Sequence, residues 1–178
     1  YFLRSLGVRD ATLALEDEHD FSAEEAFKLD TFFLSYLSGI PLDYILNESE
    51  FMGYKFYVDQ RVLIPRPETE LIVENVIELT KHKNKLHILD IGIGSGCILI
   101  SILKERNTFY GKGIDVSNKC LNISKINALK QNVHTKLKLF KSDVDKFLLG
   151  KYDLILSNPP YIKKSNLKYL EKDVGNFE

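Results

Sequence analysis

The feature that most restricts the possible folds is a series of four strand-like segments that alternate with helical segments between residues 86 and 157. Strands are expected at Leu86–Ile91, Tyr110–Ile114, Lys136–Phe140 and Asp153–Ser157. Helices are expected at about Cys97–Arg106 and Ser117–Gln131, with a short one near Val144–Leu149. This alternation predicts parallel strands joined by right-handed crossovers, hence an open α/β sheet. Ligands bind such sheets outside the carboxyl ends of the strands, at residues 92–96, 115, 141–144 and 158–161 here.

The composition is that of a globular chain that can bury a core, since 44% of the 178 residues are hydrophobic and 28% are charged. A net charge of −1 argues against nucleic-acid binding through bulk positive charge but leaves a local basic patch open. Cys97 and Cys120 have no paired spacing, so we expect no disulfide and no metal site, and a cytoplasmic location. The most apolar stretch, residues 88–103, contains Asp90 and three glycines, so no membrane segment is expected.

A glycine-rich loop follows the first of the four strands. Its residues are Gly92, Ile93, Gly94, Ser95 and Gly96. Alternate glycines permit positive φ angles and a close approach of the backbone to a ligand at a helix N-terminus, although a tight turn alone would also explain them. A dinucleotide fingerprint needs Gly or Ala where this chain has Cys97.

The second and third strands each end near an acidic residue. Asp115 lies 19 residues after Gly96, where a carboxylate can accept both hydroxyls of a ribose, unless it serves only as a helix cap. Asp143 can accept the amino group of adenine and the backbone N–H of Val144 can bond a ring nitrogen, but Asp143 can equally cap the next short helix. The pattern favours a nucleoside ligand without a pyrophosphate, and S-adenosylmethionine fits.

The tetrapeptide Asn158, Pro159, Pro160 and Tyr161 directly follows the fourth strand. The prolines stiffen the loop, and the Asn158 carboxamide oxygen and the Pro159 carbonyl can each accept a hydrogen bond from a planar NH₂ group. Such bonds would orient an amide or amine nitrogen toward a methyl donor, and Tyr161 offers a face for stacking. Alternatively, the tetrapeptide forms only a turn and has no role in catalysis.

The region before residue 86 follows other patterns. Residues 1–46 are expected to be helical, with a capping box at Ser22 and Glu25 and an apolar stripe from Ala26 to Leu37 that we assign to core packing, with a partner-binding surface as the alternative. Residues 51–64 predict two short strands joined around Asp59–Gln60, and Pro67–Thr80 predicts a helix.

Several of these segments together resemble one family. Residues from about 40 onward are similar to the N5-glutamine methyltransferases of peptide chain release factors (the HemK/PrmC family). The resemblance rests on 41–46, 63–70, 92–96 and 158–161, of which the segment Ile64-Pro-Arg-Pro-Glu-Thr-Glu70 is the most family-specific. Asn-Pro-Pro-Tyr alone is shared with methyltransferases acting on adenine or guanine.

The resemblance implies a Rossmann-like class I methyltransferase sheet and methylation of the glutamine of the Gly-Gly-Gln motif in release factors, with S-adenosylmethionine as cofactor and no metal. It implies an N-terminal helical recognition domain at 1–48, a β-hairpin linker at 49–66 and a methyltransferase domain at 67–178. Cofactor contacts map to Gly92, Ile93, Gly94, Ser95, Gly96, Asp115, Asp143, Val144 and Asn158. The glutamine clamp maps to Asn158, Pro159, Pro160 and Tyr161.

The chain departs from the family pattern in two ways. Val144 stands where an aromatic side chain is frequent, which leaves less stacking on adenine but an intact backbone donor. The family also continues beyond the tetrapeptide, so we expect that only the first half of the sheet is present and that the chain is part of a longer protein. The alternative functions are methylation of a nucleic-acid amino group and a non-catalytic cofactor-binding module. Lys163, Lys164 and Lys168 are the only nearby basic residues for the former, and we expect no direct nucleic-acid binding.

Overall fold

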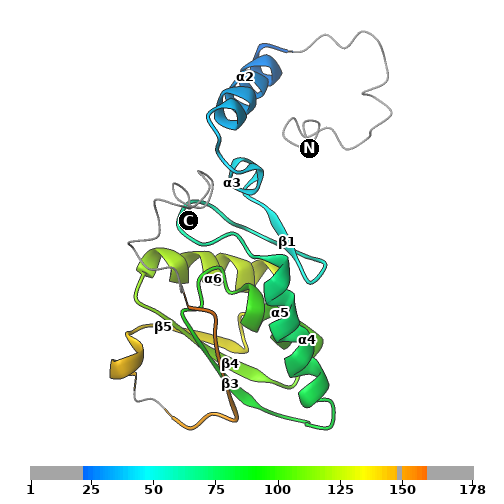
Figure 1. Cartoon of the computed structure of the whole chain (residues 1–178), viewed down its shortest axis with the longest axis vertical. Coiled ribbons are helices and arrows are strands. Elements are labelled where there is room, and N and C mark those ends of the chain that lie inside the picture. Colours follow the sequence, from blue (N-terminus) through cyan, green and yellow to red (C-terminus); the bar gives the residue numbers. More distant parts are fainter. Residues whose placement is uncertain (1–21, 148–149, 160–178) are drawn as a thin grey trace.

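The fold is a four-stranded parallel sheet with helices packed on it, preceded by a short hairpin and two helices (Figure 1). The structure, a computed structural model, describes residues 22–147 and 150–159. The sheet contains β3 (His87–Ile91), β4 (Tyr110–Asp115), β5 (Leu137–Lys141) and β6 (Leu154–Ser157) in the order β5-β4-β3-β6. Every neighbouring pair is parallel, which confirms the predicted open α/β sheet.

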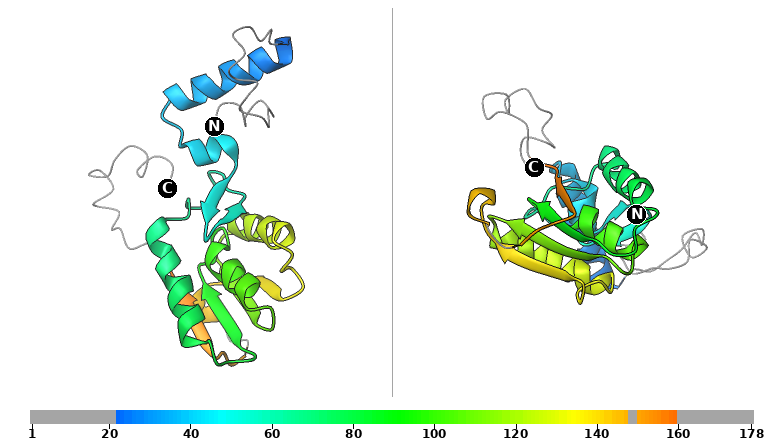
Figure 2. Two further views of the ribbon diagram at one scale, coloured as in Figure 1. Left: turned by 90° about the vertical axis from the view of Figure 1, so that its right-hand side faces the viewer. Right: turned by 90° about the horizontal axis from the view of Figure 1, so that it is seen from below.

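Three helices connect or precede these strands. They are α4 (Glu70–Leu79), α5 (Cys97–Glu105) and α6 (Asn118–Lys130), and one-turn 3₁₀ helices lie at η2 (Pro67–Thr69) and η3 (Val144–Lys146). The helices predicted at Cys97–Arg106 and Ser117–Gln131 are confirmed to within a few residues, and the Pro67–Thr80 helix starts with a 3₁₀ turn. Of the short helix expected near Val144–Leu149, the turn η3 is found, and residues 148–149 lie outside the described residues. The helical structure expected for residues 1–21 also lies outside the described residues. Helix α5 packs against both α4 and α6, so the three lie in one row beside the sheet (Figure 2).

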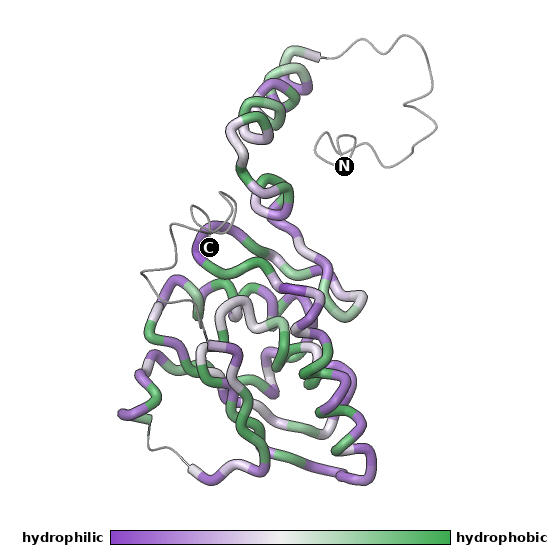
Figure 3. Tube along the Cα trace, viewed as in Figure 1, coloured by the Kyte–Doolittle hydropathy of each residue, from purple (hydrophilic) through white to green (hydrophobic). Residues whose placement is uncertain are grey.

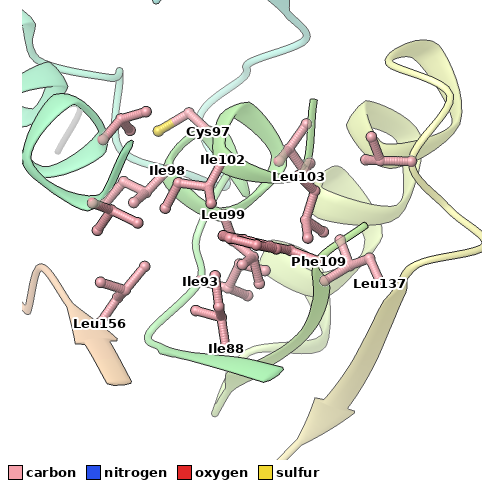
Figure 4. Packing of buried hydrophobic residues seen from close by; sticks show 14 of the residues in the cluster. Ile88, Ile93, Cys97, Ile98, Leu99, Ile102, Leu103, Phe109, Leu137 and Leu156 are labelled. Carbon is pink, nitrogen blue, oxygen red and sulfur yellow. The ribbon is translucent and has the colours of Figure 1, made fainter. Parts of the chain in front are cut away.

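The main core lies between this row of helices and one face of the sheet (Figure 4). Side chains alternate between the faces of a strand, and Ile88, Leu137 and Leu156 all point to the helix side. They meet Leu99 and Phe109, which are fully buried. Every residue of α5 from Cys97 to Leu103 is buried, so this helix is the centre of the core.

The hairpin differs from the prediction. Strands β1 (Ser49–Phe51) and β2 (Tyr54–Phe56) pair antiparallel around Met52 and Gly53, so the expected joint at Asp59–Gln60 is wrong. Both turn residues have positive φ, 53° and 70°, as a two-residue hairpin turn requires.

The apolar residues after β2 are buried in a loop rather than in a second strand. Val58 and Val62 pack with Tyr44 and Ile123 in a small second cluster, and the Tyr44 hydroxyl donates a hydrogen bond to the Val62 carbonyl at 2.8 Å. Their hydrophobicity therefore reflects burial against α3 (Leu42–Leu46) and α6, and not strand pairing.

Helix α2 (Ala23–Leu37) begins with the predicted capping box, in which the Ser22 side chain and the Glu25 side chain each bond the other residue's backbone N–H. Its apolar stripe is mostly exposed, with Phe27 73% and Leu37 80% accessible, and Phe32 is its one buried residue among those described. The expected core packing of this stripe is therefore wrong. The helix lies away from the sheet, and hydrophobic positions recur along it (Figures 1 and 3).

Within residues 22–147 and 150–159, no helix is both long and apolar enough to cross a membrane.

Candidate functional site

The glycine loop lies at the carboxyl end of β3 and is held against the end of β4. The backbone N–H groups of Gly92 and Ile93 both donate to the Ile114 carbonyl, at 2.9 and 3.0 Å. Gly92, Gly94 and Gly96 all have positive φ angles, between 55° and 84°, which confirms the prediction that these positions require glycine. Side chains would strain this backbone, and the loop leads directly into the N-terminus of α5.

Asp115 lies next to this loop and binds it. Its Oδ2 accepts the Gly94 N–H at 3.1 Å and its Oδ1 accepts the Ser117 N–H at 2.8 Å. Each carboxylate oxygen has two lone pairs, so both oxygens retain the capacity to accept a hydroxyl. The cap of α6 is the Ser117 side chain, which accepts from the Cys120 N–H, so Asp115 is not that cap.

Two side chains of α6 support the loop, and the sequence interpretation did not identify them. The Ser124 hydroxyl donates to the Gly94 carbonyl at 2.7 Å. The Asn127 side chain, fully buried, donates to the carbonyls of Ser95 and Tyr57, both at 2.9 Å, and accepts the Tyr57 N–H at 2.7 Å. The sequence signal that could have identified them is the spacing of Ser124 and Asn127, two polar residues three positions apart on the buried face of α6.

Asp90, also missed as a site residue, is buried beneath the loop with only 2% of its surface accessible. Its Oδ2 has no hydrogen-bond partner among the described residues. Loss of solvation, and secondarily the negative charge of Asp115, raise its pKa to about 7. This buried carboxyl group lies near the carboxyl end of β3, one of the two inner strands of the sheet.

Asp143 and Val144 follow the end of β5, beside Asp115, because the Ser142 N–H donates to the Asp115 carbonyl at 3.0 Å. The Asp143 side chain accepts the Asp145 N–H at 3.5 Å, so the capping role that the sequence left open is present. Val144 is half exposed at the start of η3. The contacts proposed for these residues with adenine remain predictions.

Asn158 and Pro159 follow the end of β6, and Pro160 and Tyr161 lie outside the described residues. The Ser157 hydroxyl donates to the Ile91 carbonyl at 3.0 Å, which joins this end of β6 to the start of the glycine loop. The Asn158 Nδ2 donates to the Thr69 hydroxyl at 3.4 Å. The structure therefore brings together residues from four strand ends, 92–96, 115, 142–144 and 158–159, as the sheet topology predicts.

The two cysteines do not supply a nucleophile. Burial raises the pKa of the Cys97 thiol to about 12, and burial also raises the pKa of Cys120. The Cys120 thiol donates to the Arg61 carbonyl at 3.2 Å. Within the part of the chain that the structure describes, no three His, Cys, Asp or Glu side chains form a group that could hold a metal ion.

Two curated relatives are named "Release factor glutamine methyltransferase". The protein of Streptococcus pneumoniae is 37% identical over 97% of this chain, and that of Chlorobaculum tepidum is 33% identical over 97%. The chain spans 59% and 62% of the lengths of these relatives. Their names agree with the resemblance found in the sequence motifs.

Among solved structures, a SAM-dependent methyltransferase from Geobacter sulfurreducens in complex with S-adenosylhomocysteine is 20% identical over 52% of this chain and 36% of its own, with a TM-score of 0.44. The family model described as "Methyltransferase small domain" matches residues 67–172, more than half of the chain. The matched region contains η2, α4, the whole sheet and the four strand ends described above. The chain belongs to the methyltransferase small domain family.

Proposed function

We propose that this protein transfers a methyl group from S-adenosylmethionine to the side-chain amide nitrogen of the glutamine in the Gly-Gly-Gln motif of peptide chain release factors. The observation that carries the proposal is the position of Asn158 and Pro159 at the end of β6, the strand paired with the one that leads into the glycine loop. The names of the similar proteins support the choice of substrate.

The residues at the strand ends fit S-adenosylmethionine. The backbone is open at Gly92, where a Cβ would have no atom within 4 Å, whereas a Cβ at Gly96 would lie 2.7 Å from Ile100. Asp115 retains lone pairs for two ribose hydroxyls. We assign the loop 92–96 to the methionine part, Asp115 to the ribose, and Asp143 with the Val144 N–H to the adenine. The bound cofactor supplies an electrophilic methyl group.

The substrate side of the site requires acceptors, because a primary amide presents two N–H donors. Asn158 Oδ1 and the Pro159 carbonyl are acceptors on consecutive residues, and two bonds from one NH₂ group fix the direction of its nitrogen lone pair. As the new N–C bond forms, positive charge develops on that nitrogen and the two acceptors stabilise it. With the cofactor bound, the S–CH₃ bond would break as the N–C bond forms, S-adenosylhomocysteine would leave, and one amide proton would pass to solvent water. The site therefore needs orientation rather than a strong base. By the resemblance, Pro160 and Tyr161 complete this clamp.

We further propose a division into a recognition domain at 1–48, a linker at 49–66 and the methyltransferase domain at 67–178. The exposed apolar positions of α2, which include Phe27, Leu34 and Leu37, support a protein-binding role for the first of these. Release factors act in the cytoplasm, where we therefore place the protein. We assign no direct nucleic-acid binding to it.

The test is incubation of the full-length protein with methyl-labelled S-adenosylmethionine and a purified bacterial release factor, with DNA, RNA and free adenine as alternative substrates. Label is expected only on the release factor, at the Gly-Gly-Gln glutamine. Asn158→Ala should lower kcat by about 10²–10³, the usual loss for one positioned transition-state hydrogen bond. Label on nucleic acid would favour the alternative amino-group methyltransferase, and wild-type kcat for Asn158→Ala would overturn the mechanism.

A further inference from the structure

The segment from Ile64 to Glu70 is the most distinctive of the sequence motifs, and the chemistry above gives it no task. Its backbone is stiff and well fixed. Pro65 is buried, Pro67 opens η2, and the Thr69 N–H closes that turn on the Arg66 carbonyl at 2.9 Å. The side chains of its last two residues, Thr69 and Glu70, therefore start from a fixed backbone.

Thr69 and Glu70 contact two distant parts of the chain. Glu70 Oε1 accepts the Met52 N–H in the turn of the β1–β2 hairpin at 2.6 Å. The Thr69 hydroxyl accepts from Asn158 Nδ2 at 3.4 Å, across 89 residues of sequence. The start of α4 thus lies between the hairpin and the end of β6.

Thr69 ends η2 and has helical φ and ψ angles of −72° and −19°, so the chain runs from η2 into α4 without the extended residue that a capping side chain requires. The Thr69 side chain makes no capping hydrogen bond and is therefore available for another contact. Its hydroxyl contacts the Asn158 carboxamide instead.

A hydroxyl can donate or accept, and here the Thr69 hydroxyl accepts from Asn158 Nδ2, so Oδ1 is the end of the carboxamide left for a ligand. A carboxamide has a donor end and an acceptor end of similar shape, and a rotation of 180° exchanges them. In the structure the Nδ2 end points to Thr69, and no hydrogen bond to Oδ1 is found among the described residues. An NH₂ group of a substrate needs the acceptor end, and the rotated side chain would present N–H donors that repel it.

We propose that Thr69 is a positioning residue that holds the Asn158 carboxamide with Oδ1 toward the substrate amide. The identity of the substrate amide rests on the proposed function, whereas the hydrogen bond between Asn158 and Thr69 is independent of it. The Pro65–Glu70 segment then acts as a brace: Glu70 fixes it to the hairpin, and Thr69 orients the acceptor at the end of β6.

The first test observes the side-chain amide directly and requires no substrate. In ¹⁵N-labelled full-length protein, the Asn158 NH₂ resonances are assigned by their loss in Asn158→Ala. Thr69→Val, which removes the hydroxyl at nearly constant volume, should shift these resonances, and Thr69→Ser should restore them. The matched control is Thr108→Val, because the Thr108 hydroxyl, just before β4, donates to the Asn84 carbonyl, just before β3, at the amino ends of these strands. Unshifted resonances in Thr69→Val would overturn the proposal, whatever the substrate.

The second test measures turnover of the substrate that the wild-type protein methylates. Thr69→Val should lower kcat by about 2- to 10-fold, the scale of one neutral hydrogen bond, with the dissociation constant of S-adenosylmethionine unchanged. Thr69→Ser should recover most of this loss. In an Asn158→Ala background, Thr69→Val should cause no further loss, because the two residues act through one contact. Equal losses in both backgrounds would mean that Thr69 acts independently of Asn158, which would overturn its positioning role. Absence of label on a release factor would instead count against the proposed function alone.

Discussion

The two faces of strand β4 carry different kinds of residue. Gly111 and Gly113 face the helices, whereas Tyr110 and Lys112 point to the other side. A Cβ at Gly111 would lie 2.9 Å from Leu99 of α5, and one at Gly113 would lie 2.2 Å from Ile93 of the glycine loop. On the opposite face Tyr110 is 43% exposed. Packing therefore limits the helix-facing side of β4, whereas the opposite face is exposed at Tyr110 and buried at Ile114.

The helix-facing side of β4 also lies next to the candidate cofactor site, because Gly113 is close to Ile93 of the glycine loop and to Asp90 of β3. Stability and cofactor binding are therefore linked on this side. Asp90 pairs in register with Gly113, so the absence of a side chain at Gly113 makes room for the loop directly beside the buried carboxyl group. Substitutions on the two faces should accordingly differ in size and in kind.

The largest effect is expected from Leu99→Ala. Leu99 is fully buried against Gly111, and its removal leaves a cavity that the glycine on the facing strand cannot fill. The free energy of unfolding should fall by about 2–5 kcal/mol, measured by urea denaturation of the full-length protein. A loss below 1 kcal/mol (about the cost of one methylene group) would show that this face repacks easily.

Gly113→Ala should cost somewhat less, about 1–3 kcal/mol, because a core can yield slightly to one added methyl group. The added Cβ must displace the side chain of Ile93, whose Cδ1 would lie 2.2 Å away and which belongs to the glycine loop. Affinity for S-adenosylmethionine, measured by calorimetry, should therefore fall together with stability. A loss of stability with unchanged cofactor affinity would show that packing at Gly113 does not affect the cofactor site.

Asp90 should make stability depend on pH. Burial raises its pKa to about 7, so between about pH 4 and pH 7 the folded protein retains a proton that the unfolded chain has released. This contribution is fully present below the unfolded pKa and is lost as the pH rises through 7, at up to about 1.4 kcal/mol per pH unit. Denaturation curves from pH 5 to 8 should show this decrease, and Asp90→Asn should flatten it. An equal slope in the variant would rule out Asp90 as its source.

The smallest effect is expected from Lys112→Met on the opposite face. The Lys112 ammonium lies 5.9 Å from the Phe140 ring centroid and 5.4 Å from that of Tyr152. Such partly exposed cation–π contacts contribute little, so Met should change the free energy of unfolding by at most about 1 kcal/mol. Cofactor affinity should not change. A loss as large as that of Gly113→Ala would mean that the two faces are equally constrained.

Local patterns were sufficient for most of the fold. The four strands, the helices and the parallel pairing follow from periodicity and from glycines at the turns, and the topology then places 92–96, 115, 142–144 and 158 at one edge. The hairpin was misplaced because Val58 and Val62 are buried as a loop, and apolar residues at alternate positions do not distinguish that loop from a strand. The stripe on α2 was assigned to the core for a similar reason, since periodicity shows an apolar face but not what covers it.

The sequence by itself determined the order of the elements, the glycine loop, its partner Asp115 and the tetrapeptide at the end of β6, because each follows from residue types at the ends of strands that local periodicity identifies. Only the tertiary structure decided which distant side chains support them. Asn127 joins Ser95 to Tyr57, Thr69 contacts Asn158, and Asp90 has its pKa raised. A hydrogen bond or a loss of solvation depends on which groups the folded chain brings within a few ångströms, and no local pattern encodes that distance.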